Sequence, residues 1–502
     1  MAWPIPKRRR SSTGLLIESL ISLAIGLGQS ADGRAGPAGE SLRFALHSSE
    51  VLSLAKVLAS SESPGDSYPA VSKLALDARQ PDANHLLAFE ENRSFVYAVG
   101  SSGAAVEDNH GPAQYLRMVR RLVVLKPSIL VVDDEVVHQG ADSQTGSSGA
   151  PAVEWHLYSQ RIPKLTGQTA RVTEGREQLS CETLFPRSIM QRIATQSSGG
   201  SEPEHYLVQT ISQAKSHSTR FLHLFHVVLS GSEDSAIRSE LTSEQGTWRL
   251  NVSTGQRVFR LSLPPPSESA GEIAISAANG KMLLASRPLP SGVLPHGPEG
   301  IRLLELWDGD YRGKRPPLWD IGRPADELQK LVNAGALRSC HRVVDLGCGS
   351  GTDAIYLASK GLDVTAIDIA PTALSQAQQK ARKMGVSVRW LLADVLAPPR
   401  LEPFDFIYDR GCYHVVRDQN LAAYLEMIHR FSHAGSLFLL LAARQNGQAA
   451  GNDHSGVTEE ELRYDFLPLF EFERLQEIRL ESNQPGVGPP GWAAVLRRKF
   501  AP

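Results

Sequence analysis

The spacing of apolar and polar residues changes character near residue 295. Before this point, short apolar runs separated by turn residues recur at near-regular intervals. Such runs are typical of strands in an all-β domain. Beyond it, apolar runs alternate with segments of helical periodicity, which predicts a doubly wound α/β domain with a parallel sheet. We therefore predict a multidomain chain, with an N-terminal all-β sandwich at residues 40–290 and a Rossmann-like α/β domain at residues 300–502.

Strands predicted in the N-terminal half are rich in β-branched and aromatic residues. They are residues 95–99, 120–125, 129–133, 153–159, 170–173, 205–212, 221–229, 247–252 and 258–263, with one or two more between 273 and 288. Helical periodicity is nearly absent from this half. A stretch rich in proline, serine and glycine, residues 264–298, follows the last of these strands. We place the domain boundary within it, near residue 295.

The C-terminal part predicts five strands of a parallel sheet and the helices between them. The strands are residues 342–346, 363–367, 386–392, 404–408 and 436–442. The helices are residues 326–337, 352–359, 371–384, 420–431 and 459–467. The two last apolar segments, 470–481 and 492–500, are joined by a Pro/Gly-rich link. They predict an antiparallel pair at the edge of the sheet.

A glycine-rich turn follows the first strand of this α/β part. After Asp345 come glycines at alternate positions, Gly347, Gly349 and Gly351, and then a helix. Glycine allows the backbone to adopt positive φ and to approach a ligand closely. The free N–H groups at the start of the helix favour a polar or anionic group. The turn therefore predicts a ligand site at the carboxyl end of this strand.

Acidic residues follow the next two strands. Asp368 ends the second strand, where a carboxylate binds ribose hydroxyls in nucleotide-binding units of this kind. Asp394 follows the third strand, after Ala393. A NAD-binding Rossmann unit is a competing interpretation, but its pattern is G-x-G-x-x-G, whereas this turn is G-x-G-x-G. Asp345 and Asp394 both favour a different nucleoside cofactor.

Residues 303–500 resemble the class I S-adenosylmethionine-dependent methyltransferases. Segments 306–311 and 316–324 resemble the N-terminal part of the thiopurine- and tellurite-methyltransferase-like subgroup, which closes over the cofactor. The resemblance implies that the turn lies against the methionine part, that Asp368 binds the ribose and that Asp394 accepts from the adenine amine. The cofactor-binding residues that it implies are Trp307, Trp319, Asp345, Gly347, Cys348, Gly349, Gly351, Asp368, Ile369, Asp394, Val395 and Asp409.

Several of these residues have simpler interpretations. Asp345 could cap the turn, Asp368 and Asp394 could be solvated acids at strand ends, and the two tryptophans could be core or cover aromatics without ligand contact. Cys348 stands where many small residues would fit, so we interpret its side chain as packing. The chain has four cysteines without metal or disulfide spacing, and we predict no metal site.

Methyl transfer requires an aligned nucleophile more than acid–base groups. A thiolate needs only alignment in a dry site, whereas a hydroxyl or amine must also lose a proton. Asp409 and His414, at and just beyond the tip of the fourth strand, are the predicted catalytic residues that could accept it. That strand is not followed by an Asn/Asp-Pro-Pro-Tyr-like motif, and the net charge is −2. We therefore expect a small-molecule methyl acceptor and no nucleic acid.

Residues 85–265 resemble the C-terminal β-sandwich of the heparinase II/III-like polysaccharide lyases. The resemblance lies in residues 115–136 and 153–158, with a later Leu184-Phe185-Pro186. In that family a large helical toroid precedes the sandwich and supplies much of the active site. The residues ahead of 85 lack its repeated helical pattern, so we expect no lyase activity and at most weak carbohydrate binding through Tyr115, Trp155 or Tyr158.

Residues 1–35 form a leader with basic residues 7–10 and an apolar run at 15–27. This layout is that of an export signal or anchor, although Glu18 interrupts the run; a mis-started leader is the alternative. Membrane contact is expected only through this leader. A cytoplasmic location fits a methyltransferase, because its cofactor is cytosolic. The rival function is an exported carbohydrate-binding or lyase-like protein, and a fusion of two neighbouring genes remains a third interpretation.

Overall fold

The computed structural model describes most of the chain beyond residue 84. The described residues are 42–47, 51, 85–106, 114–139, 153–196, 204–211, 218–228, 237–313, 315–445, 456–484, 486 and 488–500. The predicted leader lies outside them. Among these ranges, no helix combines the length and apolar character needed to cross a membrane.

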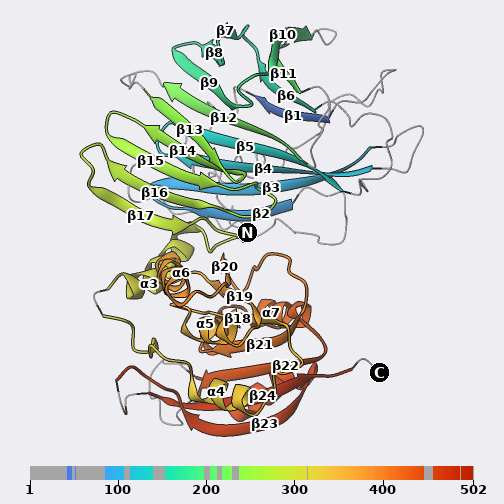
Figure 1. The fold of residues 1–502 in the computed structure, drawn as a ribbon, viewed down its shortest axis with the longest axis vertical. Helices are drawn as coiled ribbons and strands as arrows, with labels where there is room; N and C mark the ends of the chain where they lie inside the picture. Colours follow the sequence, from blue (N-terminus) through green and yellow to red (C-terminus); the bar gives the residue numbers. More distant parts are fainter. Residues whose placement is uncertain are drawn as a thin grey trace, which may run out of the picture. The chain divides into compact units, whose positions relative to one another are not determined.

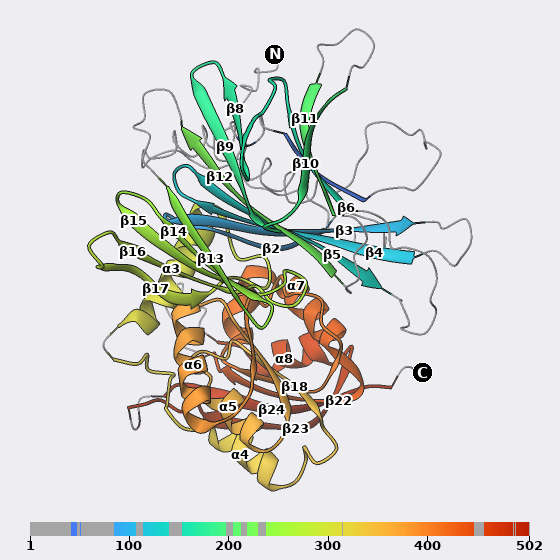
Figure 2. The ribbon, with the colours of Figure 1, turned by 45° about the horizontal axis from the view of Figure 1, so that its top comes forward.

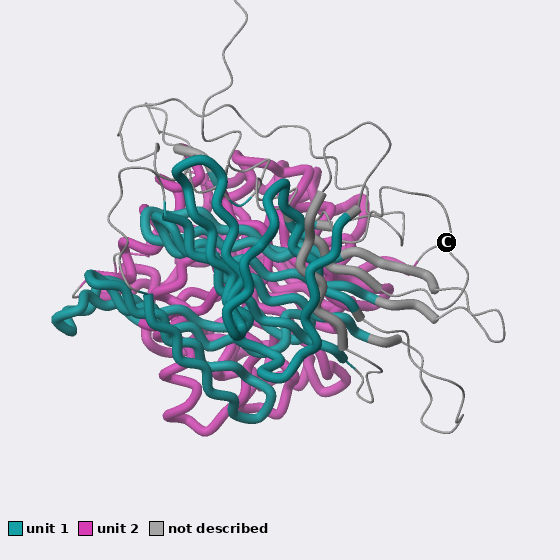
Figure 3. The backbone as a smooth tube through the Cα atoms, turned by 90° about the horizontal axis from the view of Figure 1, so that it is seen from above, with its two compact units in different colours: residues 1–285, 296–298 teal, residues 286–295, 299–502 magenta. Residues whose placement is uncertain are grey.

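The chain divides into two compact units, coloured separately in Figure 3. The N-terminal unit consists of residues 1–285 and 296–298, and the C-terminal unit of residues 286–295 and 299–502. Residues 286–295 lie before the boundary expected near residue 295, yet they group with the C-terminal unit. Each unit is described by itself below.

The described N-terminal region is mostly sheet, as predicted. Its elements are β1 (Leu42–His47), β2 (His85–Glu91), β3 (Phe95–Val106), β4 (Gln114–Leu125), β5 (Ile129–Gln139), β6 (Val153–Ser159), β7 (Lys164–Thr166), β8 (Thr169–Glu174), β9 (Glu177–Phe185), β10 (Met190–Gln196), β11 (Glu204–Ile211), β12 (Ser218–Val228), β13 (Arg238–Glu244), β14 (Thr247–Ser253), β15 (Arg257–Leu263), β16 (Glu272–Ala277) and β17 (Met282–Pro288). They form sheets in the orders β1-β6-β11-β10, β2-β3-β4-β5-β12-β9-β8-β7 and β13-β14-β15-β16-β17 (Figures 1 and 2).

Both faces of the eight-stranded sheet are covered near β5 and β12. On one face, Trp155 of β6 stacks on His223 of β12 at 3.7 Å between ring centroids, and its indole N–H donates to Asp134 of β5 at 2.8 Å. On the other face, the guanidinium carbon of Arg220 lies 3.6 Å from the ring centroid of Trp248 of β14. Because successive strand residues point to opposite faces, one strand serves both contacts. Trp155 is fully buried, so its side chain cannot provide the sugar-binding surface that we expected.

The C-terminal unit is a doubly wound α/β fold. Its elements are α3 (Gly297–Arg312), α4 (Asp326–Asn333), β18 (Arg342–Leu346), α5 (Thr352–Ser359), β19 (Asp363–Asp368), α6 (Pro371–Met384), β20 (Arg389–Leu392), β21 (Phe404–Arg410), α7 (Tyr413–Phe431), β22 (Ser432–Ala443), α8 (Glu459–Phe466), β23 (Phe470–Arg479) and β24 (Pro490–Arg498). The strand order is β20-β19-β18-β21-β22-β24-β23. The first five strands are parallel, and β24 pairs antiparallel with both β22 and β23, which confirms the predicted antiparallel pair.

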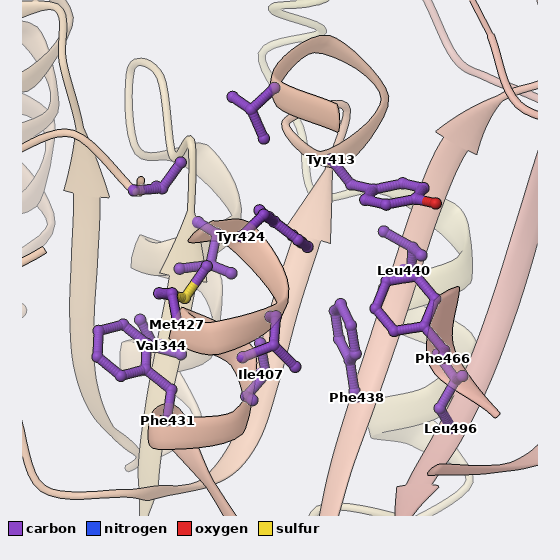
Figure 4. Close-up of a cluster of buried hydrophobic side chains, with 14 of the residues drawn as sticks. Val344, Ile407, Tyr413, Tyr424, Met427, Phe431, Phe438, Leu440, Phe466 and Leu496 are labelled. Atoms are coloured by element: carbon purple, nitrogen blue, oxygen red, sulfur yellow. The ribbon is translucent and has the colours of Figure 1, made fainter. Parts of the chain in front are cut away.

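Helices pack on both faces of this sheet. The side chains of α7 and α8 pack on one face in an aromatic cluster that includes Tyr413, Tyr424, Phe438 and Phe466 (Figure 4). The rings of Tyr413 and Phe466 lie 5.1 Å apart between centroids. The helices α4 and α5 pack on the other face. This burial fixes the carboxyl ends of β18, β19 and β21, where the predicted site residues lie.

Three helices differ from the sequence prediction, and the first is α4, which was predicted at 326–337 and ends at Asn333. The helix predicted at 420–431 begins seven residues earlier, at Tyr413, and has a non-helical residue, Asn420, at the predicted start. The segment that contains Trp307 was predicted without a helix and forms α3. The earlier start of α7 brings His414 into a helical turn, with consequences for its chemistry.

Candidate functional site

The turn between β18 and α5 places three glycines at positive φ. The φ angles are 66° at Gly347, 53° at Gly349 and 77° at Gly351. A Cβ atom on Gly349 would lie 2.5 Å from the hydroxyl of Tyr311, and one on Gly351 would lie 2.5 Å from the ring of Trp390. The glycines are therefore required both by backbone conformation and by close packing around the turn.

Asp368, at the end of β19, stabilises this turn. Its Oδ2 accepts from the N–H of Gly349 at 2.7 Å, and its Oδ1 accepts from the N–H of Ala370 at 2.8 Å. Each carboxylate oxygen has a second lone pair, so both can accept one more hydrogen bond. Burial raises the pKa of Asp368 to about 6, although the two N–H groups act in the opposite direction. The two backbone bonds therefore leave acceptor capacity on the carboxylate, which is compatible with the ribose contact that the sequence predicts.

Asp345 precedes the turn by two residues, near the carboxyl end of β18. It is 2% exposed, and its Oδ2 has no hydrogen-bond partner among the described residues. Burial raises its pKa well above the usual range, and the negative charges of Asp353, Asp409 and Asp368 raise it further, against a lowering by Arg410. A buried carboxyl group with an unused oxygen fits a ligand that brings a positive charge, as a sulfonium cofactor with an amino group does.

The third predicted contact, Asp394, follows β20. Its Oδ1 accepts from the N–H of Leu396 at 2.9 Å, and burial raises its pKa. Val395 is buried and Ile369, beside Asp368, is half-buried. Asp368 and Asp394 follow adjacent parallel strands, so their backbones lie at the same edge of the sheet. A nucleoside could contact both.

An aromatic group from α3 and the following segment lies at the glycine turn. The hydroxyl of Tyr311 accepts from the indole N–H of Trp319 at 3.0 Å. The rings of Trp307 and Trp319 meet edge to face at 5.8 Å between centroids. Tyr311 is 7% exposed and Trp319 is 41% exposed. The structure thus brings both predicted tryptophans to the site, with Tyr311 between Trp319 and Gly349.

The segment of residues 315–322, here called the strap, is hydrogen-bonded to the sheet. Arg410 of β21 donates to the carbonyl of Trp319 at 2.9 Å, and Asn483 donates through its side chain to the carbonyl of Pro317 at 2.8 Å. At the turn, the hydroxyl of Ser350 donates to Asp320 at 2.6 Å. These bonds hold the strap and its tryptophan against the carboxyl end of the sheet.

The carboxylate of Asp409 is held by hydrogen bonds within the protein, which makes it a poor proton acceptor for a substrate. It is fully buried, and it accepts from the hydroxyl of Tyr424 at 2.6 Å and from the N–H groups of Cys412 and Tyr413. Burial raises its pKa to about 6. These bonds satisfy the first N–H groups of α7. The geometry therefore favours a structural role for Asp409 over the catalytic and cofactor-binding roles that the sequence predicted.

His414, the second predicted catalytic residue, lies in the first turn of α7. Its Nδ1 accepts from the N–H of Ala443 at 3.3 Å. A backbone N–H can only donate, so the neutral ring carries its proton on Nε2. Burial lowers the pKa of His414 to about 4. The ring is therefore a neutral hydrogen-bond donor at physiological pH and a poor proton acceptor.

Neither of the cysteines at the site supplies a base. Cys348 is half-buried within the turn, and a Cβ on Gly347 would lie 2.8 Å from the Cβ of Cys412. Burial, with nearby aspartates, raises the pKa of both thiols well above the usual range. Both are protonated at neutral pH, which agrees with the packing role that we expected for Cys348.

The sequence interpretation did not single out Tyr311, Asp320 or Arg410 as site residues. One signal was present for Tyr311, because Trp307 and Tyr311 are four residues apart and a helix would place them on one face. Asp320 and Arg410 have no such signal, since their roles depend on the path of the strap. Among the described residues, no cluster of His, Cys, Asp and Glu could hold a metal ion.

The C-terminal part of the chain is similar in sequence to known methyltransferases. Residues 343–435 match the family model of a methyltransferase domain. A 2-heptyl-1-hydroxyquinolin-4(1H)-one methyltransferase of Mycobacteroides abscessus is 29% identical over 195 residues, which are 37% of this chain and 84% of that protein. A probable thiol methyltransferase 2 of Arabidopsis thaliana is 23% identical over 185 residues, which are 36% of this chain and 79% of that protein.

Among solved structures, the N-methyltransferase NodS from Bradyrhizobium japonicum, in complex with S-adenosyl-L-homocysteine, is similar to 39% of this chain and 98% of its own, with 17% identity and a TM-score of 0.32. The family match and the two relatives confirm the predicted methyltransferase and its cofactor, S-adenosylmethionine. They give no support to the rival function of an exported carbohydrate-binding or lyase-like protein.

Proposed function

We propose that this chain, an S-adenosylmethionine-dependent methyltransferase of small molecules, methylates acceptors that reach the site as anions. Thiolates and the acidic oxygens of N-hydroxy compounds are such acceptors. The observation that supports this proposal is the state of the two predicted bases. Asp409 is enclosed by four hydrogen bonds, and the Nδ1 lone pair of His414 is already used.

Residues of the C-terminal unit divide the binding of the cofactor between them in this proposal. When bound, S-adenosylmethionine supplies a methyl group activated by a sulfonium charge. The glycine turn and Asp345 hold the methionine end, Asp368 accepts from the ribose hydroxyls, and Asp394 accepts from the adenine amine. Ile369 and Val395 supply apolar surface beside the base. Placing the acceptor and the methyl group at reacting distance supplies up to about 7–11 kcal/mol.

The strap and its aromatic residues exclude water in this proposal. An anionic acceptor is strongly hydrated, and its nucleophilicity rises when water is removed. Trp319 stands at the solvent edge of the aromatic group, while Tyr311 is buried beneath it. In this proposal the Nε2–H of His414 orients the acceptor oxygen or sulfur by donating to it. The names of the two curated relatives agree with this choice, since one acts on a 1-hydroxyquinolinone and the other on a thiol.

The test is a panel of acceptors of similar shape and different acidity, assayed with the full-length chain by formation of S-adenosylhomocysteine. A thiophenol, a 1-hydroxyquinolin-4-one, a benzyl alcohol and a benzylamine form such a panel. We expect the first two to react, with kcat/KM rising with pH up to the pKa of each acceptor and then levelling. Methylation of the neutral alcohol or amine at comparable rates would contradict the proposal.

His414→Asn provides the matched variant for this test. The Oδ1 of asparagine occupies nearly the position of the histidine Nδ1 and can accept from Ala443, but it does not titrate near neutral pH. We expect kcat/KM for the thiol to change less than tenfold and its pH profile to keep its shape. A loss of about 10²- to 10⁴-fold, the usual contribution of a general base, would assign that role to His414.

For the N-terminal unit, we propose a heparinase-like β-sandwich that binds carbohydrate weakly. The supporting observation is a polar group on the face of β6 opposite Trp155. There the buried His156 holds two half-buried side chains that a sugar could reach: its Nδ1 lies 3.0 Å from the hydroxyl of Tyr158, and its Nε2 lies 2.9 Å from Glu154. The side chain of Tyr115, also expected to contribute, lies outside the described residues.

We further propose a cytoplasmic location, since the cofactor is made there.

Calorimetric titration of the full-length chain with heparin and alginate oligosaccharides tests the sugar-binding proposal. We expect weak binding that Tyr158→Phe reduces. No heat of binding would contradict it, and an enzyme-dependent rise in the far-ultraviolet absorbance of an unsaturated product would support the lyase alternative instead.

A further inference from the structure

The chain that follows β17 lies along the end of β20. We call residues 289–294 the wall segment. The N–H of Ser291 donates to the carbonyl of Leu392, the last residue of β20, at 2.8 Å. β20 is the outermost strand on its side of the described sheet, so its outer polar groups would otherwise lack partners. The wall segment therefore covers part of this edge, immediately before Ala393 and Asp394.

Close packing fixes the backbone of the wall segment at this place. A Cβ atom on Gly292 would lie 3.0 Å from the Cβ of Ala393 and 3.3 Å from both the carbonyl oxygen of Ala397 and the Cδ of Pro399. The glycine thus fits against both sides of the loop that contains Asp394. A larger residue would push this loop or the wall segment aside.

The other end of the wall segment reaches the glycine turn. Leu294 is 2% exposed and belongs to a small core cluster with Leu374 of α6 and Leu392. Cys348, in the middle of the turn, packs against this cluster. The segment therefore contacts the surroundings of both Asp394 and the turn, which are the two positions expected to hold opposite ends of the cofactor.

We propose that the wall segment forms one side of the nucleoside end of the cofactor site. The proposal rests on the proposed function, because it takes Asp394 as the adenine contact. The ligand class is a 5′-thionucleoside, shared by S-adenosylmethionine, S-adenosylhomocysteine and methylthioadenosine. The segment buries the edge of the base from water and fixes the loop that presents Asp394. The Pro-rich stretch that the sequence assigned to an interdomain linker thus contributes to binding.

Two substitutions in the full-length chain test this inference by calorimetric titration. Gly292→Val displaces the loop around Asp394, and Ser291→Pro removes the N–H donor to Leu392. We expect each to weaken binding of all three thionucleosides by about tenfold or more, and by similar factors, because they share the nucleoside. Ser291→Ala keeps the N–H and should bind like the wild type.

Gly255→Val is the control for the added valine, because Gly255 lies in the turn between β14 and β15 and a Cβ there would meet no atom within 4 Å. Circular dichroism and thermal unfolding establish that each variant is folded. Wild-type affinity in folded Gly292→Val and Ser291→Pro would overturn the inference and leave the proposed function intact. A wild-type chain that binds none of the three ligands would instead contradict the proposed function.

Discussion

The eight-stranded sheet and the glycine-turn site both bury carboxyl groups, but only the sheet pairs them with cations. In the sheet, Asp134 accepts from Arg120 at 2.6 and 2.9 Å, and Asp133 accepts from both Arg121 and Arg220. Asp133 and Asp134 are 0% exposed, and the nearest cations are themselves buried. Both carboxylates are therefore paired with cations without a ligand.

At the glycine-turn site, the buried Asp345 and Asp409 and the half-buried Asp368 lie near enough to affect one another, and among the described residues none of the three is paired with a cation. Asp368 and Asp409 accept mainly from backbone N–H groups, and Asp345 has an oxygen without a partner. Arg410 is the cation that most affects Asp345, yet it donates to the carbonyls of Trp319 and Glu481. The difference teaches that the first region is stabilised by its own contacts, whereas the second is arranged for a positive charge that the ligand brings.

The largest effect is expected at the turn, with Gly349→Val. The new Cβ would lie 2.5 Å from the Tyr311 hydroxyl at a residue with φ of 53°. We expect no measurable binding of S-adenosylmethionine by calorimetry. Gly361→Val is the control, since Gly361 also has positive φ but open space around it. Retained affinity in the Gly349 variant would show that the turn does not shape the ligand site.

Breaking an ion pair in the sheet should affect stability and leave binding unchanged. Arg120→Met leaves Asp134 buried without its cation, and removing one partner of such a pair costs about 3–5 kcal/mol. Urea unfolding measures the loss, and calorimetry with S-adenosylmethionine should give the wild-type dissociation constant. Arg249→Met, in an exposed pair with Glu244, should cost less than about 1 kcal/mol. Equal effects of the two variants would remove the distinction between the regions.

A smaller effect is expected for Asp368→Ala. Losing one hydrogen bond to a charged acceptor costs about 1.5–3 kcal/mol, so affinity for S-adenosylmethionine should fall at least about 10- to 150-fold. Asp368→Asn keeps one acceptor oxygen and should lose less. The measurement is again calorimetric titration of folded protein. An unchanged dissociation constant would mean that Asp368 only stabilises the turn through Gly349.

The pH dependence of the stability of the C-terminal unit, with and without ligand, should show how its buried acids differ from the paired acids of the eight-stranded sheet. The pKa of Asp368 and that of Asp409 are both about 6, above the value of about 3.9 in an unfolded chain. The folded unit then binds more protons than the unfolded chain between about pH 4 and 6, so stability without ligand falls as pH rises through this window. Each group contributes up to about 3 kcal/mol.

A cationic ligand stabilises the ionised acids and therefore opposes the loss of stability as pH rises through their pKa values. We therefore expect the rise in the melting temperature caused by saturating S-adenosylmethionine to be larger at pH 7.5 than at pH 5.5. S-adenosylhomocysteine lacks the sulfonium charge and should show a weaker pH dependence. Identical shifts for the two ligands at both pH values would contradict the role assigned to the buried acids.

The sequence was most informative where local signals coincide with the fold. The predicted bounds of α5 and α6 agree with the structure, because Gly351 precedes one helix, and Pro371 and Gly385 stand at the start and end of the other. The start of α7 was predicted wrongly because its first N–H groups bond to Asp409, which belongs to the preceding strand. No Ser, Thr, Asp or Asn stands directly before the helix to reveal it.

In the N-terminal unit, β9 and β10 were not among the predicted strands. Their residues are largely polar, and in β9 the buried positions are mostly small or aliphatic residues separated by half-buried ones, as in Leu179, Cys181 and Thr183. A strand covered on one side by other elements needs few large apolar residues, so composition alone does not identify it.

At the site, the positions of the glycines and acids were predictable because they depend on the ends of parallel strands. The availability of a base was not, because it depends on distant partners. The hydroxyl of Tyr424, fifteen residues beyond Asp409, donates a hydrogen bond to that carboxylate. The N–H of Ala443 donates to the Nδ1 of His414. The wall segment was hidden for a similar reason, since its Pro-rich composition indicates a linker and its contacts lie about one hundred residues away.

The ion pairs of the eight-stranded sheet also specify how β4 and β5 align. In the observed register, Arg120 stands opposite Asp134 and Arg121 opposite Asp133. If β4 slipped by one residue so that Val119 faced Asp134, each side chain of β4 would turn to the other side of the sheet. A buried carboxylate would then lose its cation, at a cost of several kcal/mol. Two adjacent acids opposite two adjacent arginines thus make a misaligned sheet far less stable than the native one.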